Sequence, residues 1–146
     1  MPIVFLSPST QDWNPYVTGS GSEEYWMNRI VDAMEPYLRS NGIRYRRNDP
    51  DTSAGAAIRE ANSGYYDFYL ALHYPGSSGG QRGAELIAKN LREIYPLPDK
   101  VTTRPTTALG EVSRSRFPAV LVEIGYHDNY SDALWLESHV EDVARQ

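Results

Sequence analysis

A carboxylate interrupts an apolar run in the C-terminal third of the chain. Glu123 follows the residues AVLV, 119–122, and precedes Ile124. Removing a carboxylate from water is costly unless it is paired or bound to a metal. A carboxyl group whose pKa is raised by such surroundings is suited to activating a water molecule, including a metal-bound one. Glu123 is therefore a candidate catalytic residue, and a buried ion pair with Arg114 or Arg116 is the structural alternative.

Two more residues could act together with Glu123. His73 ends the apolar segment 68–72, and Glu24 lies in the first turn of a predicted helix. Each alone has an ordinary role, because a histidine at a strand end commonly makes hydrogen bonds and an acid at a helix start interacts favourably with the helix dipole. Together, two carboxylates and an imidazole at the loop-facing ends of separate elements are sufficient to begin a zinc hydrolase site.

The other two histidines differ in what their positions allow. His127 lies four residues after Glu123 and would share a face with it if the strand remained extended. It is a candidate metal ligand, although Gly125 and the turn residues 128–129 favour a strand end and a surface role. His139 lies among acidic residues in the last predicted helix and is expected to face solvent. Because the chain has no cysteine, a metal would have nitrogen and oxygen ligands only.

Length and charge limit the classes of partner. A chain of 146 residues is about one domain long, so we expect a single catalytic domain over 1–146. The formal charge of -5 is spread without a basic block, which argues against nucleic acid as a partner. No run of 18 apolar residues occurs, and the N-terminal residues lack the pattern of an export signal, so we expect no membrane insertion.

Alternating strands and helices must position these residues. The predicted strands cover 3–6, 43–47, 65–73 and 119–125. The predicted helices cover 22–41, 54–63, 84–91 and 131–144. Residues 76–80 are expected to form a flexible loop, and residues 101–108 an extended stretch. This order predicts an α/β fold with a mixed, mostly parallel twisted sheet and helices on both faces. Sites in such sheets lie outside the carboxyl ends of the strands, where 7–11, His73 and 123–129 fall.

Three segments resemble the zinc-dependent N-acetylmuramoyl-L-alanine amidases of the Amidase_3 family of bacterial cell-wall hydrolases. The segment 118–126, PAVLVEIGY, is similar to the family segment that carries the catalytic glutamate. The stretch 61–73, from Ala-Asn to LALH, resembles the segment that holds a zinc histidine. Glu24, followed four residues later by Asn28, resembles the start of the first helix, which supplies the zinc glutamate. The similarity runs essentially from end to end.

The resemblance implies a phosphorylase/hydrolase-like fold and a reaction. Zn²⁺ would be held by Glu24, His73 and a third group, and Glu123 would take a proton from the metal-bound water and return it to the leaving amine. The implied substrate is peptidoglycan, cleaved at the amide between N-acetylmuramic acid and L-alanine. The implied enzyme is a monomer that acts outside the cell or in the cell wall.

The first predicted strand departs from the family pattern. Residues 7–11 read SPSTQ, where the family usually has an Asp-Pro-Gly-His-Gly type of turn with the first zinc histidine. Hydroxyl and amide oxygens are poor substitutes for imidazole on zinc, and His127 is the candidate replacement. Two alternatives therefore stand beside the amidase: a metal-free degenerate amidase domain that binds peptidoglycan or a partner, and a zinc exopeptidase.

Overall fold

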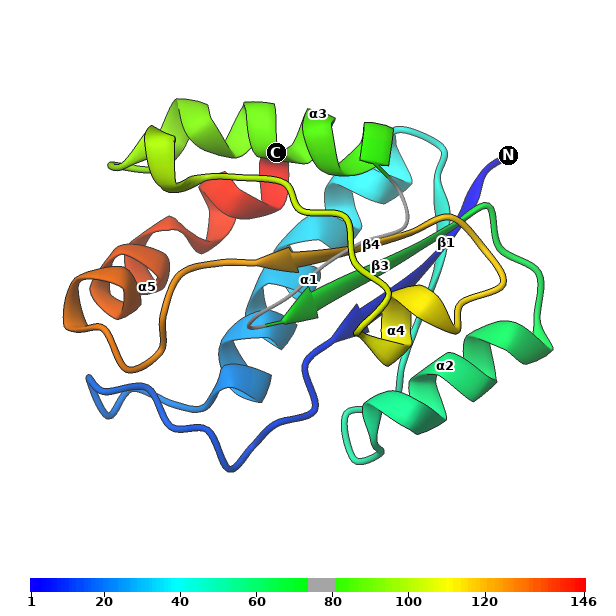
Figure 1. The fold of residues 1–146 in the computed structure, drawn as a ribbon, viewed down its shortest axis with the longest axis horizontal. Helices are drawn as coiled ribbons and strands as arrows, with labels where there is room; N and C mark the ends of the chain where they lie inside the picture. Colours follow the sequence, from blue (N-terminus) through cyan, green and yellow to red (C-terminus); the bar gives the residue numbers. More distant parts are fainter. Residues whose placement is uncertain (74–80) are drawn as a thin grey trace.

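The computed structural model describes residues 1–73 and 81–146, whose strands form a four-stranded parallel sheet in the order β2-β1-β3-β4 (Figure 1). The strands are β1 Ile3–Pro8, β2 Arg44–Arg47, β3 Phe68–His73 and β4 Ala119–Glu123. The helices are α1 Glu23–Ser40, α2 Ala54–Ser63, α3 Gln81–Ile94, the short α4 Gly110–Ser113 and α5 Tyr130–Arg145, with a 3-10 turn, η1, at Pro98–Lys100. Since helices lie on both faces of a parallel sheet, the predicted fold class is confirmed.

Alternate residues of the inner strands face two separate parts of the core. Leu6, Leu70 and Leu72 belong to a cluster with α1, α3 and α5, while Phe5 and Tyr69 pack with α2 and α4. Figure 1 shows α1 behind the strands and α4 in front of them. Successive side chains of a strand point to opposite faces, so odd-numbered positions of β1 and β3 face α4. That face continues to His73.

Helix α1 begins at the carboxyl edge of the sheet. Ser22 is its N-cap, and the Ser22 side chain accepts a hydrogen bond from the backbone N–H of Tyr25. Two acids, Glu23 and Glu24, occupy the first turn. Because one residue turns an α-helix by about 100°, these neighbours point in different directions. Glu23 is fully buried and Glu24 is only partly buried.

The structure differs from the sequence prediction in the ends of some strands and in one short helix. Strand β3 begins at Phe68, three residues later than predicted, and β4 ends at Glu123, two residues earlier than predicted. Helix α4 was not predicted, because four residues carry no readable helical period. The predicted loop at 76–80 lies outside the described residues. Among the helices of residues 1–73 and 81–146, none is long and apolar enough to cross a bilayer.

Candidate site at the carboxyl edge of the sheet

His73 lies between two buried carboxylates. Its Nε2 is 2.6 Å from Oε2 of Glu111, and its Nδ1 is 3.6 Å from Oε1 of Glu23. The exposed fractions of His73, Glu111 and Glu23 are 7%, 5% and 1%. The 2.6 Å between Nε2 and Oε2 is the separation of a short, charge-assisted contact. Three elements, β3, α4 and α1, therefore meet at one imidazole.

Glu111 is held by two hydroxyl groups as well as by His73. The side chains of Ser7 and Tyr69 each donate a hydrogen bond of 2.6 Å to Oε1 of Glu111. Burial acts to raise the pKa of Glu111, but His73 and these two hydroxyls hold it below its ordinary value. Burial and the neighbouring carboxylate raise the pKa of Tyr69, so its phenol remains a donor. The carboxylate of Glu111 is thus charged and fixed in place.

Amide side chains from the loop after β1 hold Glu23. Asn14 donates to Oε2 of Glu23 at 3.1 Å, and Gln11 donates to Oε1 at 3.4 Å. Burial acts to raise the pKa of Glu23, yet the neighbouring His73, Ser9 and Asn14 lower it. Gln11, at the end of the segment 7–11 where the family pattern places a zinc histidine, here donates to a carboxylate instead.

The two carboxylates stabilise the charged form of His73. Burial acts to lower the pKa of an imidazole, because it disfavours the cation. Glu111 and Glu23 outweigh this effect and raise the pKa of His73 from 6.5 to about 9. At neutral pH the site therefore contains one imidazolium and two carboxylates.

Glu123 lies beside this cluster at the end of the neighbouring strand. It pairs in register with His73 across β3 and β4. Its side chain reaches solvent, but protein atoms on its inner side withdraw it from water and raise its pKa to about 7. The positive charges of His73 and Arg104 oppose this rise, and the charge of Glu23 adds to it. Glu123 can therefore gain or lose a proton near neutral pH.

The other two predicted ligands have hydrogen-bond partners outside the His73 cluster. The carboxylate of Glu24 accepts a hydrogen bond of 3.0 Å from Asn28 on its own helix. Strand β4 ends at Glu123, and Gly125 turns the chain with a φ of +80°. The strand thus ends before His127, as Gly125 and the turn residues 128–129 favoured, and Nδ1 of His127 lies 3.2 Å from the carbonyl oxygen of Pro15. In place of Glu24 and His127, the structure brings Glu23 and Glu111 to His73.

Sequence reasoning missed both of these acids. Glu23 is adjacent to the residue chosen from the Glu-x-x-x-Asn spacing, and only the rotation of α1 distinguishes them. Glu111 lies in a four-residue helix and has no motif of its own. The polar Ser7 at an inward-facing position of β1 was the available indication, because a buried hydroxyl needs a partner.

The side chains present do not fit the implied zinc ion. Glu111 and Glu23 face opposite nitrogens of one ring, so one ion could not contact all three residues. Two ligands of a tetrahedral zinc lie about 3.3 Å apart, farther than the 2.6 Å between His73 and Glu111. Among the described residues, no three His, Asp or Glu side chains are arranged to hold a metal. Residues 74–80, YPGSSGG, contain none of these residue types.

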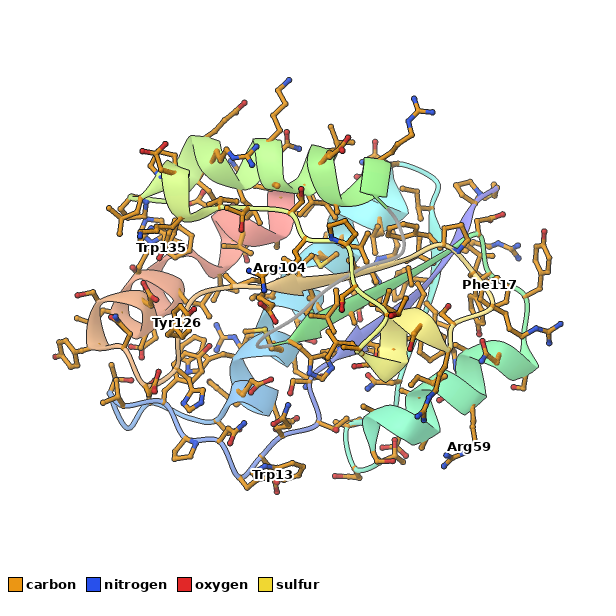
Figure 2. The ribbon with its side chains drawn as sticks, in the orientation of Figure 1. Trp13, Arg59, Arg104, Phe117, Tyr126 and Trp135 are labelled. Atoms are coloured by element: carbon orange, nitrogen blue, oxygen red, sulfur yellow. The ribbon has the colours of Figure 1, made fainter. Side chains whose placement is uncertain are left out.

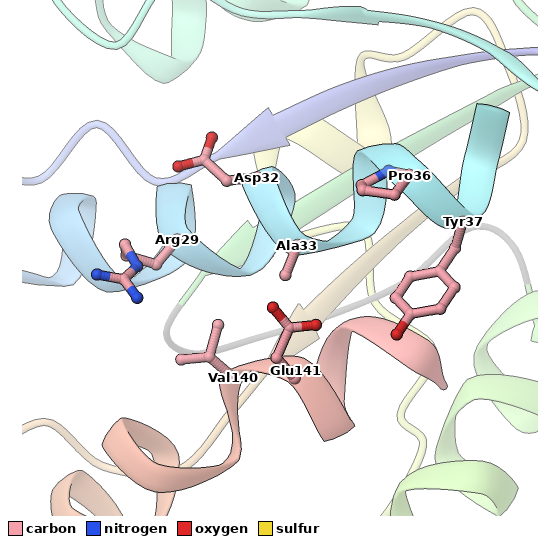
Figure 3. Close-up of a pocket in the computed structure, with 7 residues that line it drawn as sticks. All are labelled: Arg29, Asp32, Ala33, Pro36, Tyr37, Val140 and Glu141. Atoms are coloured by element: carbon pink, nitrogen blue, oxygen red, sulfur yellow. The ribbon is translucent and has the colours of Figure 1, made fainter.

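A groove between α1 and α5 is a separate surface feature (Figure 3). It is lined by Arg29, Asp32, Ala33, Pro36, Tyr37, Val140 and Glu141. None of the residues around His73 lines it, and Asp32 is already paired with Arg47. The groove therefore adds nothing to the chemistry of the carboxyl-edge site.

Several solved structures with this arrangement of strands and helices are amidases. The amidase AmiC2 of Nostoc punctiforme superposes with a TM-score of 0.80 over 99% of this chain and 91% of its own, at 14% identity. The chain has the amidase fold. CwlD of Clostridioides difficile, solved in complex with the GerS lipoprotein, gives 0.78 over 99% and 93% at 15% identity. Ami1 of Mycobacterium smegmatis gives 0.72 over 99% and 92% at 16% identity.

Sequence comparisons are negative by contrast. No family model matches the chain, and no curated protein sequence matches it. The likeness at 14 to 16% identity establishes the shared fold, and the function must be argued from the site.

Proposed function

We propose that this chain binds peptidoglycan at the muramoyl-peptide junction without hydrolysing the amide bond there. The carboxyl edge of the sheet is where open α/β folds place ligands. The proteins that share this fold are named for the N-acetylmuramoyl-L-alanine bond. This supports peptidoglycan as the ligand of the same edge here.

One observation carries the choice of binding over hydrolysis. Each ring nitrogen of His73 faces a buried carboxylate, so the histidine that the resemblance assigns to zinc has its charge satisfied within the protein. Within the part of the chain that the structure describes, the cation at the centre of the cluster is the imidazolium of His73, and its burial keeps it from acting as the electrophile for an amide carbonyl.

Hydrolysis remains a second candidate because of Glu123. A carboxyl group with a pKa of about 7 is suited to proton transfer at neutral pH. Its place next to His73 is where a general base would be useful. A zinc exopeptidase would need the same base.

Purified cell walls distinguish these functions. The chain is mixed with walls, with and without added zinc, and the pellet and the soluble fraction are analysed by mass spectrometry. The binding function predicts co-sedimentation with intact walls, reduced binding to walls stripped of stem peptides by a known amidase, and no release of stem peptide. Release that Glu123→Gln abolishes would establish hydrolysis instead. Cleavage of plain peptides would indicate an exopeptidase, and failure to sediment would reject wall binding.

A further inference from the structure

We propose that Glu111 is the permanent counter-ion of His73, and that this internal ion pair takes the place of the zinc ion implied by the family resemblance. The pair is independent of wall binding and concerns the protein alone. The resemblance assigns His73 to zinc and assigns no role to Glu111, which lies outside the three matching segments.

The surroundings of Glu111 are built to keep it charged. An isolated buried carboxylate is unfavourable, and it persists only when hydrogen bonds and an opposite charge compensate for lost water. Here Ser7 and Tyr69 donate to one oxygen while His73 contacts the other. Because β1 and β3 pair with Ser7 next to Ala71, inward positions of both strands converge on α4. The three described polar partners of the Glu111 carboxylate thus all come from the sheet that forms the site.

The arrangement also occupies the ring of His73. Zinc requires a neutral imidazole with a free nitrogen lone pair. Glu111 lies at Nε2 and Glu23 at Nδ1, and both favour a proton on the nitrogen that they face. A zinc ion would have to displace a proton and separate an ion pair at the same time.

The acids around His73 come from three elements and act in the same direction, while Arg104 acts on Glu123. Glu23 of α1, Glu111 of α4 and Glu123 of β4 all favour the imidazolium, and Tyr69 of β3 stays neutral. Gln11 and Asn14, which hold Glu23, carry no charge. Among the described side chains, the imidazolium of His73 is thus in contact with two carboxylates, Glu111 and Glu23, and with no other cation.

The experiment is nuclear magnetic resonance of the ¹⁵N-labelled histidine rings, combined with zinc titration of the wild-type chain. At pH 7.5 both ring nitrogens of His73 are expected to carry protons, and bound zinc is expected to be well below one ion per chain. In Glu111→Gln, the midpoint of the His73 titration is expected to fall by about one to three pH units. Glu60→Gln is the control, since Glu60 forms an exposed pair with Arg46 and its loss should leave His73 unchanged.

Two results would overturn the proposal: a neutral His73 ring in the wild type at pH 7.5, or about one tightly bound zinc per chain. An unchanged His73 titration in folded Glu111→Gln would also reject Glu111 as the counter-ion. If that variant does not fold, the NMR spectrum and the zinc titration of the wild-type chain still test the proposal. Wall binding plays no part in these measurements, so their outcome is separate from that of the proposed function.

Discussion

The Nε2 atom of His73 lies 2.6 Å from Oε2 of Glu111, and both side chains are buried. A buried ion pair stabilises a protein little more than apolar residues of the same volume would. Removing one partner, however, leaves an uncompensated buried charge and is strongly destabilising. The stability of this protein should therefore depend on the protonation of a single histidine.

We expect the free energy of unfolding to fall as pH rises from 6.5 through 9. The pKa of His73 is raised from 6.5 to about 9 on folding. The resulting stabilisation is fully present below pH 6.5 and is lost as pH passes the folded value. A shift of this size corresponds to on the order of 3 kcal/mol. Urea denaturation at pH 6, 7.5 and 9 measures it.

The variant His73→Gln is the comparison for this pH dependence. Its overall stability should be lower, because Glu111 and Glu23 lose their cation, but the fall between pH 6.5 and 9 should be much smaller than in the wild type. Equal slopes in the two proteins would mean that other groups cause the pH dependence, and would contradict a raised pKa of His73.

Replacing Ser7 by alanine should destabilise the chain by about 1.5 to 3 kcal/mol, the range for hydrogen bonds to charged groups. The Ser7 hydroxyl is buried and donates to Glu111, so its loss leaves a buried carboxylate with one donor fewer. Ser40→Ala is a matched control, because Ser40 is exposed and its hydroxyl bonds to the backbone oxygen of Tyr37 and to the side-chain amide of Asn41, with no charged partner. If the free energy of unfolding falls equally little in both variants, the hydrogen bond of Ser7 does not stabilise the site.

The sheet and its covering helices could be predicted because their patterns are local. The apolar run in β1, the N-cap at Ser22 and the apolar run in β4 each depend on neighbouring residues alone. Parallel order then follows from the alternation of strands and helices. The carboxyl-edge position of His73 and Glu123 could be predicted for the same reason, and the structure places them in register.

The ion pair could not be predicted in the same way. Glu111 is 104 residues from Ser7 and 38 residues from His73 in the sequence. Their contacts depend on which faces of β1 and β3 point toward α4, and on where this short helix lies. The choice between Glu23 and Glu24 depends on the rotation of α1 about its axis, which residue spacing does not determine. Local pattern identified the edge, and tertiary packing decided which acids lie there.

We expect Glu137→Ala to loosen the loop before α1. Glu137 of α5 accepts hydrogen bonds from Thr18 and Ser20, and Ser20 also accepts one from the indole of Trp26. Losing a charged acceptor worth about 1.5 kcal/mol should speed local opening roughly tenfold. Hydrogen exchange of the Tyr16 amide, which bonds to Gly21 within this loop, measures the change.

The control for this loop is Glu141→Ala, an exposed acid one turn later on α5. It should leave exchange of the Tyr16 amide unchanged. Figure 2 shows Trp13 and Tyr126 on the two loops at this end of the molecule, and the bond from the amide of Val17 to the carbonyl of His127 joins these loops. Unaltered exchange in Glu137→Ala would mean that the contacts of His127 with Val17 and Pro15 hold the loop without Glu137.

Gly125→Ala should destabilise the protein more than Gly42→Ala. Both glycines have positive φ, +80° and +69°, a conformation that costs another residue about 1 to 2 kcal/mol. At Gly42 an added Cβ would meet nothing within 4 Å, whereas at Gly125 it would lie 3.1 Å from Cβ of Asp132. Asp132 also accepts a hydrogen bond from the amide of Tyr126, so the chain after Glu123 cannot shift freely. Urea denaturation of both variants measures the difference. Equal losses of stability would show that Asp132 moves away from the added Cβ without destabilising the protein.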